Sequence, residues 1–183
     1  MGDMNAGGHR PSTVGGYAWL SLGSNIDPRN HLGLALSLLR DRFGRLTVSS
    51  VYRTPAVGFD GPDFLNLAVG IDSDLGPEAL NAWLHALEER LGRHRDVPRF
   101  SSRTLDIDIV LFGDRVMSGP GHLQLPREEL AKQAFVLGPM AQIAGDLLHP
   151  ILGKSLAQLW NEFPPADKLG LVAVEPLEPV QVG

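Results

Sequence analysis

The chain has 183 residues, 43% of them hydrophobic and 20% charged, which is typical of one globular domain with additional terminal segments. Its formal net charge of −5 argues against a nucleic-acid-binding protein, since these usually carry a basic excess. The absence of cysteine excludes disulfide bonds, thiolate nucleophiles and Cys-ligated metal centres. No apolar run approaches the roughly 18 residues of a membrane-spanning helix. We expect a cytoplasmic monomer that binds neither membranes nor nucleic acid.

The two ends of the chain differ in composition from its centre. Residues 1–16 contain no apolar segment of the kind found in secretory signals, and we expect a flexible leader there. Residues 17–163 hold the apolar patterns of a folded domain, and residues 164–183 form a tail that contains Pro and Glu. We therefore expect one domain, with a leader before it and a tail after it.

Apolar periodicity and turn residues predict the secondary structure of the domain. Four strands are expected, over residues 17–22, 45–54, 64–73 and 104–112. Helices are expected to start at Pro28 and Pro77, and Gly44 is a natural end for the first of them. The resulting order, strand-helix-strand-strand-helix-strand, is the βαββαβ pattern of a ferredoxin-like α+β sandwich.

The chain continues beyond the last of these strands in a C-terminal hairpin and helical extension. Residues 113–126 are expected to form the hairpin, residues 127–145 and 155–163 to be helical, and residues 169–174 to add a strand. In a ferredoxin-like sandwich the two main helices cover one face of an antiparallel sheet. We expect the other face to be free for long loops and a ligand.

Two aspartates stand in the middle of an apolar strand, in the stretch RFSSRTLDIDIVLFGD. Asp106 and Asp108 alternate with Leu105, Ile107 and Ile109, although strands disfavour Asp. Alternation places both carboxylates on one face of the strand, with Cβ atoms roughly 6–7 Å apart. Both could therefore reach one metal ion or a pair of ions.

A loop rich in arginine precedes this strand and contains Arg93, Arg95, Arg99 and Arg103. Carboxylates that collect Mg²⁺ beside arginines are what phosphoryl transfer requires, because the metal neutralises oxygen charge and guanidinium groups hold phosphates. The alternative is a solvated strand face next to a solvated loop. The combination of both features favours the phosphoryl-transfer interpretation.

Three weaker signals have simple structural alternatives. Gly23 is expected between a strand and a helix, where an anion could approach the backbone, although the chain has no Walker A motif. In the Pro/Gly-rich segment 52–66, Phe64 could stack on a flat heterocycle and Asn66 could hydrogen-bond to it. Alternatively, Phe64 is a core residue and Asn66 belongs to a turn. Glu88, taken alone, is typical of a surface carboxylate on a helix.

Several motifs occur together in a characteristic order: LGSN, YRTPAVG, DFLN, E-x-x-L-G-R-x-R and R-T-L-D-I-D-I-V-L-F-G-D. Over residues 17–163 the chain resembles the 6-hydroxymethyl-7,8-dihydropterin pyrophosphokinase family of folate biosynthesis. The resemblance implies a ferredoxin-like fold, with ATP and a dihydropterin alcohol as substrates. It also implies transfer of pyrophosphate to the pterin hydroxymethyl group, with AMP as the other product.

The resemblance also implies the roles of individual residues. Two Mg²⁺ ions would be held by Asp106 and Asp108. The implied catalytic residues are Arg93, Arg103, Asp106 and Asp108. The implied pterin-binding residues are Thr54, Pro55, Val57, Phe64, Asn66, Phe100 and Phe135. The implied ATP-binding residues are Glu88, Arg95, Ile109 and Arg127.

The chain departs from the family pattern at a few of these motifs. FSSR replaces the usual W-G-P-R, so that Phe100, Ser101 and Ser102 stand in place of Trp, Gly and Pro. Arg127 follows Pro126 where the family has P-H-Y, and Gln133 replaces a basic residue. Arg127 could supply the missing positive charge as a phosphate ligand.

Two alternatives to a pyrophosphokinase stay open from the sequence. One is a pterin- or nucleotide-binding paralogue with little or no transferase activity, and the other is a ferredoxin-like regulatory module that binds a small effector. Binding alone would not require two metal-binding carboxylates. The presence of Asp106, Asp108, Arg93 and Arg103 therefore favours the enzyme.

Overall fold

A six-stranded antiparallel sheet forms the centre of the computed structural model, which describes residues 14–92 and 104–177. Its strands are β1 (Gly16–Ser24), β2 (Thr47–Val48), β3 (Val51–Thr54), β4 (Phe64–Ser73), β5 (Asp106–Phe112) and β8 (Val172–Val174). They lie in the order β5-β1-β4-β3-β8, with β2 beside β4. The strands β6 (Met117–Gly119) and β7 (Leu123–Leu125) form the expected separate hairpin.

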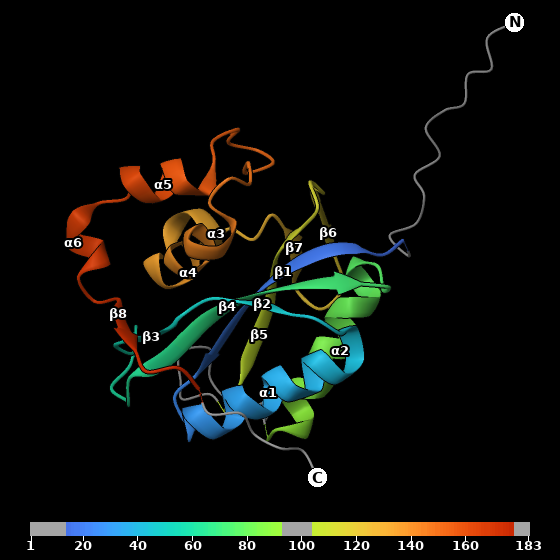
Figure 1. The fold of residues 1–183 in the computed structure, drawn as a ribbon, viewed down its shortest axis with the longest axis horizontal. Helices are drawn as coiled ribbons and strands as arrows, with labels where there is room; N and C mark the ends of the chain where they lie inside the picture. The colour runs from blue at the N-terminus through green and yellow to red at the C-terminus, as the bar shows by residue number, and fades with distance from the viewer. Residues whose placement is uncertain (1–13, 93–103, 178–183) are drawn as a thin grey trace, which may run out of the picture.

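Helices lie on both faces of the sheet, so the fold is a mixed α/β arrangement (Figure 1). The helices are α1 (Pro28–Phe43), α2 (Pro77–Arg90), α3 (Glu129–Lys132), α4 (Ala134–Ala144), α5 (Leu156–Glu162) and α6 (Pro165–Lys168). α1 and α2 cover one face and begin at the expected prolines, whereas α3, α4 and α5 lie on the other side. Within the described residues, none of the helices has both the length and the apolar character needed to cross a membrane.

The centre of the sheet is buried on both faces, which explains the sequence of β4. On the side of α1 and α2, Leu20 and Leu22 of β1 pack with Ile107 of β5 in a large apolar cluster. On the opposite side, Val110 and Met140 belong to a second cluster. A strand with two buried faces is expected to be a nearly continuous apolar run, and β4 reads FLNLAVGIDS.

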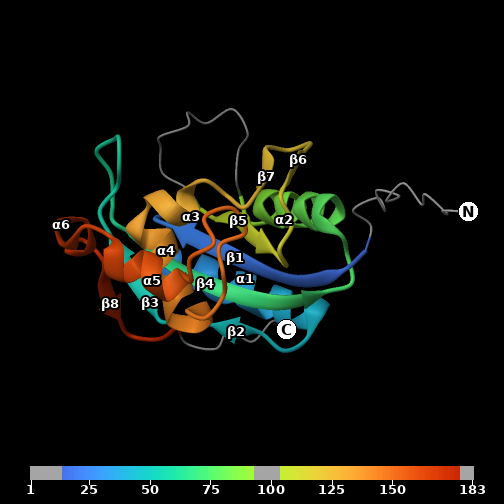
Figure 2. The same ribbon diagram turned by 90° about the horizontal axis from the view of Figure 1, so that it is seen from above.

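The expectation that the second face is free was therefore wrong in part. α4 packs on this face and buries Val136, Leu137 and Met140 in one cluster with Ala68 of β4. Figure 2 shows α3, α4 and α5 gathered toward the end of the sheet that carries β3 and β8. The cause is the apolar character of α4 itself, which has to bury its side chains against another surface.

The expected strand over residues 45–54 is divided into β2 and β3 by Ser49 and Ser50. The Ser49 hydroxyl accepts the N–H of Ala68 at 2.8 Å, and the Ser49 N–H donates to the carbonyl of Ala68 at 2.9 Å. A side-chain oxygen thus takes the place of a backbone acceptor, as serine often does where it competes with regular structure. The β-branched composition of residues 45–54 does not reveal that a serine side chain replaces a backbone acceptor here.

The helical stretch expected over residues 127–145 is also interrupted. Gln133 is extended (φ −117°, ψ 123°) between α3 and α4, and its carbonyl accepts the N–H groups of Val136 and Leu137. In the tail, the expected strand is confirmed as β8, which pairs with β3. The short helix α6 was not expected from the sequence.

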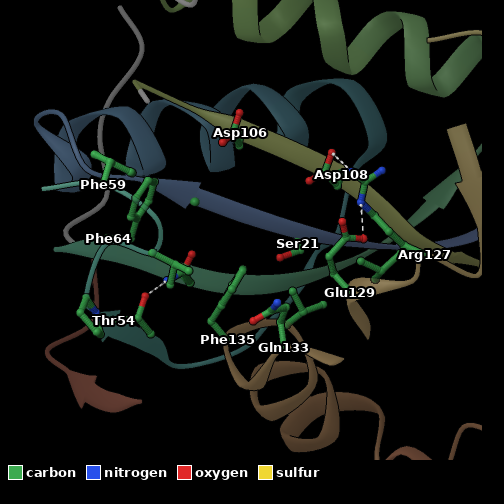
Figure 3. Close-up of a pocket in the computed structure, with 16 residues that line it drawn as sticks. Ser21, Thr54, Phe59, Phe64, Asp106, Asp108, Arg127, Glu129, Gln133 and Phe135 are labelled. Carbon is green, nitrogen blue, oxygen red and sulfur yellow. Dashed lines mark hydrogen bonds and ion pairs between the residues drawn. The ribbon is translucent and has the colours of Figure 1, made fainter. Parts of the chain in front are cut away.

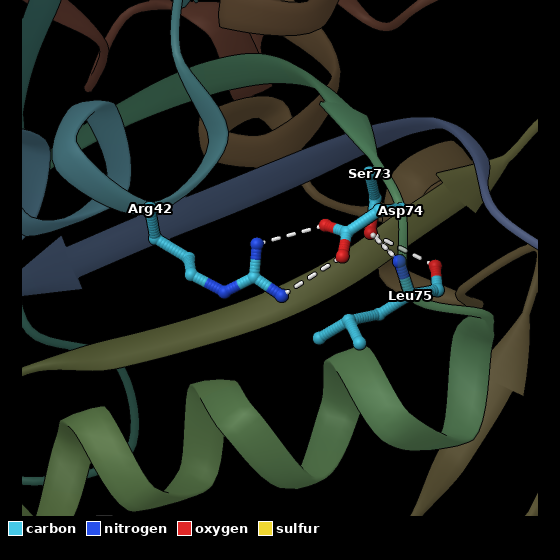
Figure 4. Close-up of polar contacts among 4 residues, drawn as sticks. All are labelled: Arg42, Ser73, Asp74 and Leu75. Carbon is cyan, nitrogen blue, oxygen red and sulfur yellow. Dashed lines mark hydrogen bonds and ion pairs between the residues drawn. The ribbon is translucent and has the colours of Figure 1, made fainter.

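A bidentate ion pair joins the end of α1 to the turn before α2 (Figure 4). The two Nη atoms of Arg42 lie 2.8 and 3.1 Å from the carboxylate oxygens of Asp74. This hydrogen bonding lowers the pKa of Asp74 and raises the pKa of Arg42. The neighbouring Ser73 hydroxyl accepts the N–H of Leu75 and donates to its carbonyl, which fixes the turn. Exposed pairs of this kind contribute little to stability, so it mainly orients the turn.

A buried histidine organises the loop between α4 and α5. The side chain of His149 is only 6% exposed, and its Nδ1 accepts the N–H groups of Ile151 and Leu152 at 3.2 and 3.1 Å. Its backbone N–H donates to the carbonyl of Lys154 at 2.8 Å. Burial lowers the pKa of His149, because the charged imidazolium loses its hydration.

We expect His149 to make the stability of the protein depend on pH. In the unfolded chain its pKa is near 6.5, whereas the folded protein keeps the imidazole neutral to a lower pH. The unfolded state therefore binds more protons below about pH 6.5, and the free energy of unfolding should fall as pH decreases from 7 to 5.

Urea denaturation at both pH values measures this effect. His149→Asn supplies an amide oxygen that can accept the same N–H groups without titrating, and it should flatten the pH dependence. His149→Ala should lower stability at both pH values. An Asn variant that retains the full wild-type pH dependence would contradict this assignment.

Candidate active site

A cavity of about 410 Å³ opens on the face of the sheet opposite α1 and α2, next to α3 and α4 (Figure 3). It collects most of the sequence-predicted site residues that the structure describes: Thr54, Pro55, Val57, Phe64, Asn66, Asp106, Asp108, Arg127 and Phe135. Thr54, Phe64 and Phe135 lie toward one end of the cavity, and Asp106 and Asp108 toward the other. The cavity is thus divided into an aromatic and amide end and a charged end.

The pairing of the strands positions the two ends relative to each other. Gly23 of β1 lies directly opposite Asn66 on β4 and Asp106 on β5, while Ser21 lies opposite Asp108. Directly opposite residues of antiparallel strands point to the same face. Because neighbouring strands are about 4.8 Å apart, Asn66 and Asp106 are separated by roughly 10 Å across Gly23.

Gly23 does not lie between a strand and a helix, as the sequence suggested, but inside β1. A Cβ atom at this position would be 2.8 Å from Oδ1 of Asn66, so a larger residue would push against the amide. The missing side chain therefore keeps the space between the two ends of the cavity open.

The amide end is built around a buried hydrogen bond. The side-chain amide of Asn66, only 4% exposed, donates from Nδ2 to the Thr54 hydroxyl at 2.7 Å. This bond fixes the plane of the amide, so Asn66 is a rigid polar group inside β4 and not a turn residue. The ring of Phe59 meets that of Phe64 edge to face, with 6.4 Å between centroids, and adds an apolar wall.

The charged end is organised by Arg127. Its backbone N–H donates to the carbonyl of Val110 at 3.0 Å, next to the point where the register of β5 against β1 shifts. Its Nε lies 3.2 Å from Oε2 of Glu129, and its Nη2 lies 3.6 Å from Oδ1 of Asp108. The guanidinium thus stands between two carboxylates on different elements.

The donor set at this end fits a divalent cation that arrives with a phosphate ligand. Among the residues with described positions, no three His, Asp or Glu side chains converge on one point. Mg²⁺ is commonly bound by one or two carboxylates together with substrate phosphates and water, rather than by a complete protein cage. Asp106 and Asp108, on one face of β5, supply such a pair.

Two predicted site residues lie elsewhere. Ile109 is 2% exposed in the core beneath the sheet, and Glu88 of α2 is 1% exposed, with Oε1 4.0 Å from Nε2 of His85. The surface position expected for Glu88 from the sequence alone is wrong, because this side of α2 faces the interior. Four other predicted site residues lie outside the described residues: Arg93, Arg95, Phe100 and Arg103. The described residues on either side of this segment, Gly92 and Thr104, are neighbours.

Sequence reasoning missed several residues that line the cavity, including Ser21, Phe59, Val110, Glu129 and Val136. A signal existed for Ser21, because small or polar residues alternate with Leu20 and Leu22 in the first strand. No comparable signal identified Glu129, whose role depends on where Arg127 lies. Its place at the site becomes visible only from the arrangement of α3 against β5.

Paired carboxylates, an arginine and an aromatic pocket on one sheet face are typical of enzymes that transfer phosphorus-containing groups between two substrates. A comparison with known protein families gives a specific match: residues 19–145 fit the model of 7,8-dihydro-6-hydroxymethylpterin-pyrophosphokinase (HPPK). The chain belongs to this family and is therefore a diphosphotransferase. This confirms the family suggested by the sequence motifs.

Curated relatives support the assignment over most of the chain. A 2-amino-4-hydroxy-6-hydroxymethyldihydropteridine pyrophosphokinase of Pseudomonas aeruginosa is 38% identical over 154 residues, which cover 80% of this chain and 91% of that protein. A Bacillus subtilis protein of the same name is 39% identical over 130 residues, covering 69% and 77%. In a Synechocystis protein of this name, 35% identical over 131 residues, the match covers 72% of this chain and 63% of that protein.

Solved structures share the fold. The crystal structure of Plasmodium falciparum HPPK-DHPS wild type with pteroate aligns with a TM-score of 0.67 over 82% of this chain, at 14% sequence identity. The wild-type structure of the same protein gives a TM-score of 0.64 over 82% of this chain, also at 14% identity. This chain spans 45% of the length of each of those chains.

Gly23→Ala should distort the amide end of the cavity. The new methyl group would lie 2.8 Å from Oδ1 of Asn66, so the amide has to move and strain its bond to Thr54. We expect the free energy of unfolding to fall by about 1–3 kcal/mol, the range for overpacked interiors. Urea denaturation measures the change, and Ser21→Ala on the same face of β1 is the control. If the urea midpoint of Gly23→Ala equals that of the wild type, the position of the Asn66 amide is not tightly constrained.

Proposed function

We propose that the chain catalyses the Mg²⁺-dependent transfer of pyrophosphate from ATP to 6-hydroxymethyl-7,8-dihydropterin, giving AMP and the pterin diphosphate. The observation that carries this proposal is the row formed by Asp106, Gly23 and Asn66 across three strands. The row supports the proposal because the carboxylate that would bind the metal and the amide that would bind the heterocycle lie on one face, separated by a residue without a side chain. A ring held by Asn66 can thus direct its hydroxymethyl group over Gly23 toward the metal.

The amide end suits the pterin. A pterin ring presents donors and acceptors along its edge and apolar faces above and below, and Asn66 offers both a donor and an acceptor. The bond to Thr54 holds this amide in one orientation before the ligand binds. Phe64 and Phe135 supply aromatic surface for the ring faces, and Pro55 and Val57 add apolar contacts at the cavity wall.

The charged end suits the triphosphate of ATP. Asp106 and Asp108 would hold two Mg²⁺ ions, which neutralise charge on the phosphate oxygens. Arg127 would bind the phosphates through its Nη groups. The pterin hydroxyl oxygen would attack the β-phosphorus and release its proton to water, while the bond to the oxygen of the α-phosphate breaks and AMP leaves. The protein contributes alignment and charge stabilisation, and no covalent intermediate is required.

Other assignments from the sequence are part of the same proposal. Arg93 and Arg103 would stabilise the transferred group, Arg95 and Phe100 would contact the substrates, and Glu88 and Ile109 would support the nucleotide site. The strand order β5-β1-β4-β3 supports a ferredoxin-like classification with an added hairpin and helical extension. A cytoplasmic monomer remains the expectation for the protein in the cell.

The carboxylate pair should be essential for turnover. Asp106→Asn and Asp108→Asn each remove a metal ligand and should lower kcat by at least about a hundredfold, while leaving the fold intact. The measurement is AMP formation from ATP and the dihydropterin alcohol at saturating Mg²⁺. Asp72→Asn, an exposed aspartate at the other end of β4, is the matched control. Near-normal turnover in either variant would refute the metal assignment.

Asn66→Ala should weaken pterin binding far more than nucleotide binding. The variant leaves polar groups of a buried heterocycle unpaired, which is unfavourable by about 1–3 kcal/mol for each group. Calorimetric titrations with the dihydropterin alcohol and, separately, with a nonhydrolysable ATP analogue compare the two losses. Asn161→Ala changes an exposed amide outside this cavity and should affect neither. Equal losses for both ligands would place Asn66 outside the pterin site.

A further inference from the structure

Arg127 lies in a predominantly negative environment at the charged end of the cavity. Three carboxylates line this end, from Asp106, Asp108 and Glu129, whereas Arg127 is the cation that lines it among the described residues. Arg127 is 24% exposed, Asp108 42% and Glu129 39%, so the three groups are accessible to a ligand in the cavity. A free polyphosphate would be repelled by the carboxylates unless cations accompany it.

The two contacts of the Arg127 guanidinium are unequal. Nε and Glu129 form an ion pair at 3.2 Å, whereas Nη2 and Asp108 are 3.6 Å apart, which is too long for a hydrogen bond. The contact with Asp108 is therefore a Coulombic attraction that a competing cation can replace. The contact with Glu129 is made through Nε, so the Nη groups can turn toward other acceptors.

We propose that Glu129 is a positioning residue that holds Arg127 beside Asp108 before substrates bind and presents it to the nucleotide phosphates afterwards. The inference rests on the proposed function, because it requires a metal at Asp108 and phosphates in the same cavity. Before binding, the guanidinium offsets part of the negative charge of Asp108 that would attract the metal. With a cation at Asp108, the Arg127 guanidinium would lose its attraction to this carboxylate and would turn toward the phosphates.

The backbone limits how far Arg127 can move. Its N–H donates to the carbonyl of Val110 on β5, so the base of the side chain stays beside the strand that carries the aspartates. Glu129 follows two residues later, at the start of α3. Only the end of the side chain therefore has to turn from Asp108 toward a phosphate, with its Nε still bound to Glu129.

The proposal predicts effects of opposite sign for Arg127→Gln. Removing the competing cation should strengthen the binding of Mn²⁺ alone by about two- to fivefold, the range for partly exposed ion pairs. Removing a phosphate ligand should weaken the binding of Mg²⁺ with α,β-methylene-ATP by about ten- to a hundredfold. A purely structural role for Arg127 would weaken both.

Glu129→Gln distinguishes positioning from simple charge. Neutralising a carboxylate should by itself strengthen the binding of an anionic nucleotide, because a repulsion is removed. If Glu129 acts through Arg127, the variant should instead weaken binding of the analogue severalfold. In an Arg127→Gln background the same change should leave binding unchanged or strengthen it, and this reversal is the signature of the coupling.

Glu128→Gln is the matched control for Glu129→Gln. Glu128 is adjacent in the chain and carries the same charge, but it pairs with Lys132 and does not line the cavity. It should change neither titration. Arg127→Lys keeps the charge and should bind Mn²⁺ alone as the wild type does, which provides a second variant if Arg127→Gln fails to fold.

Both titrations use the full chain, with Mn²⁺ binding followed by electron paramagnetic resonance and analogue binding by calorimetry. Wild-type protein that binds neither ligand would overturn the proposed function and this inference with it. If wild type binds both, two results would overturn the inference alone. One is equal effects of Glu129→Gln in both backgrounds, and the other is a loss of Mn²⁺ affinity in Arg127→Gln.

Discussion

The pairing of β1 with its two neighbours is the constraint on which the site depends. β1 lies between β4 and β5, and the positions of Gly23, Asn66 and Asp106 follow from one register. A shift of one residue would turn every side chain to the opposite face, and would carry Leu20 and Leu22 out of the core. Burial of these leucines is therefore what aligns the polar groups on the other face. The free energy that stabilises the core also determines the geometry of the cavity.

The parts of the fold that were predicted correctly follow from local periodicity. Asp106 and Asp108 share a face because side chains alternate along any strand, and α1 and α2 begin at prolines suited to a first helical turn. The parts that were missed depend on distant contacts. Glu88 is buried because of what packs against α2, a fact that its neighbours in the sequence do not encode.

The interruptions of regular structure escaped prediction for a related reason. Ser49 divides a strand because its hydroxyl accepts a hydrogen bond from the N–H of Ala68, nineteen positions further along the chain. Gln133 separates two helices and in doing so reaches the cavity, at a position where the sequence resemblance implies a basic residue. Arg127, which precedes α3 in the chain, lines the same cavity. The sequence analysis suggested that Arg127 supplies the positive charge missing at Gln133, and the folded arrangement adds that both residues line one cavity.

The margins of the sheet have a consequence for how the molecule behaves at high concentration. An unpaired strand exposes a row of N–H and C=O groups that can pair with another molecule and start aggregation. On one margin, the three residues of β8 pair with β3 and leave only a short terminal strand. On the other margin, the N–H of Arg127 donates a hydrogen bond to the carbonyl of Val110 on β5. The backbone contact that holds Arg127 at the cavity thus also leaves one acceptor fewer on this edge for another molecule to pair with.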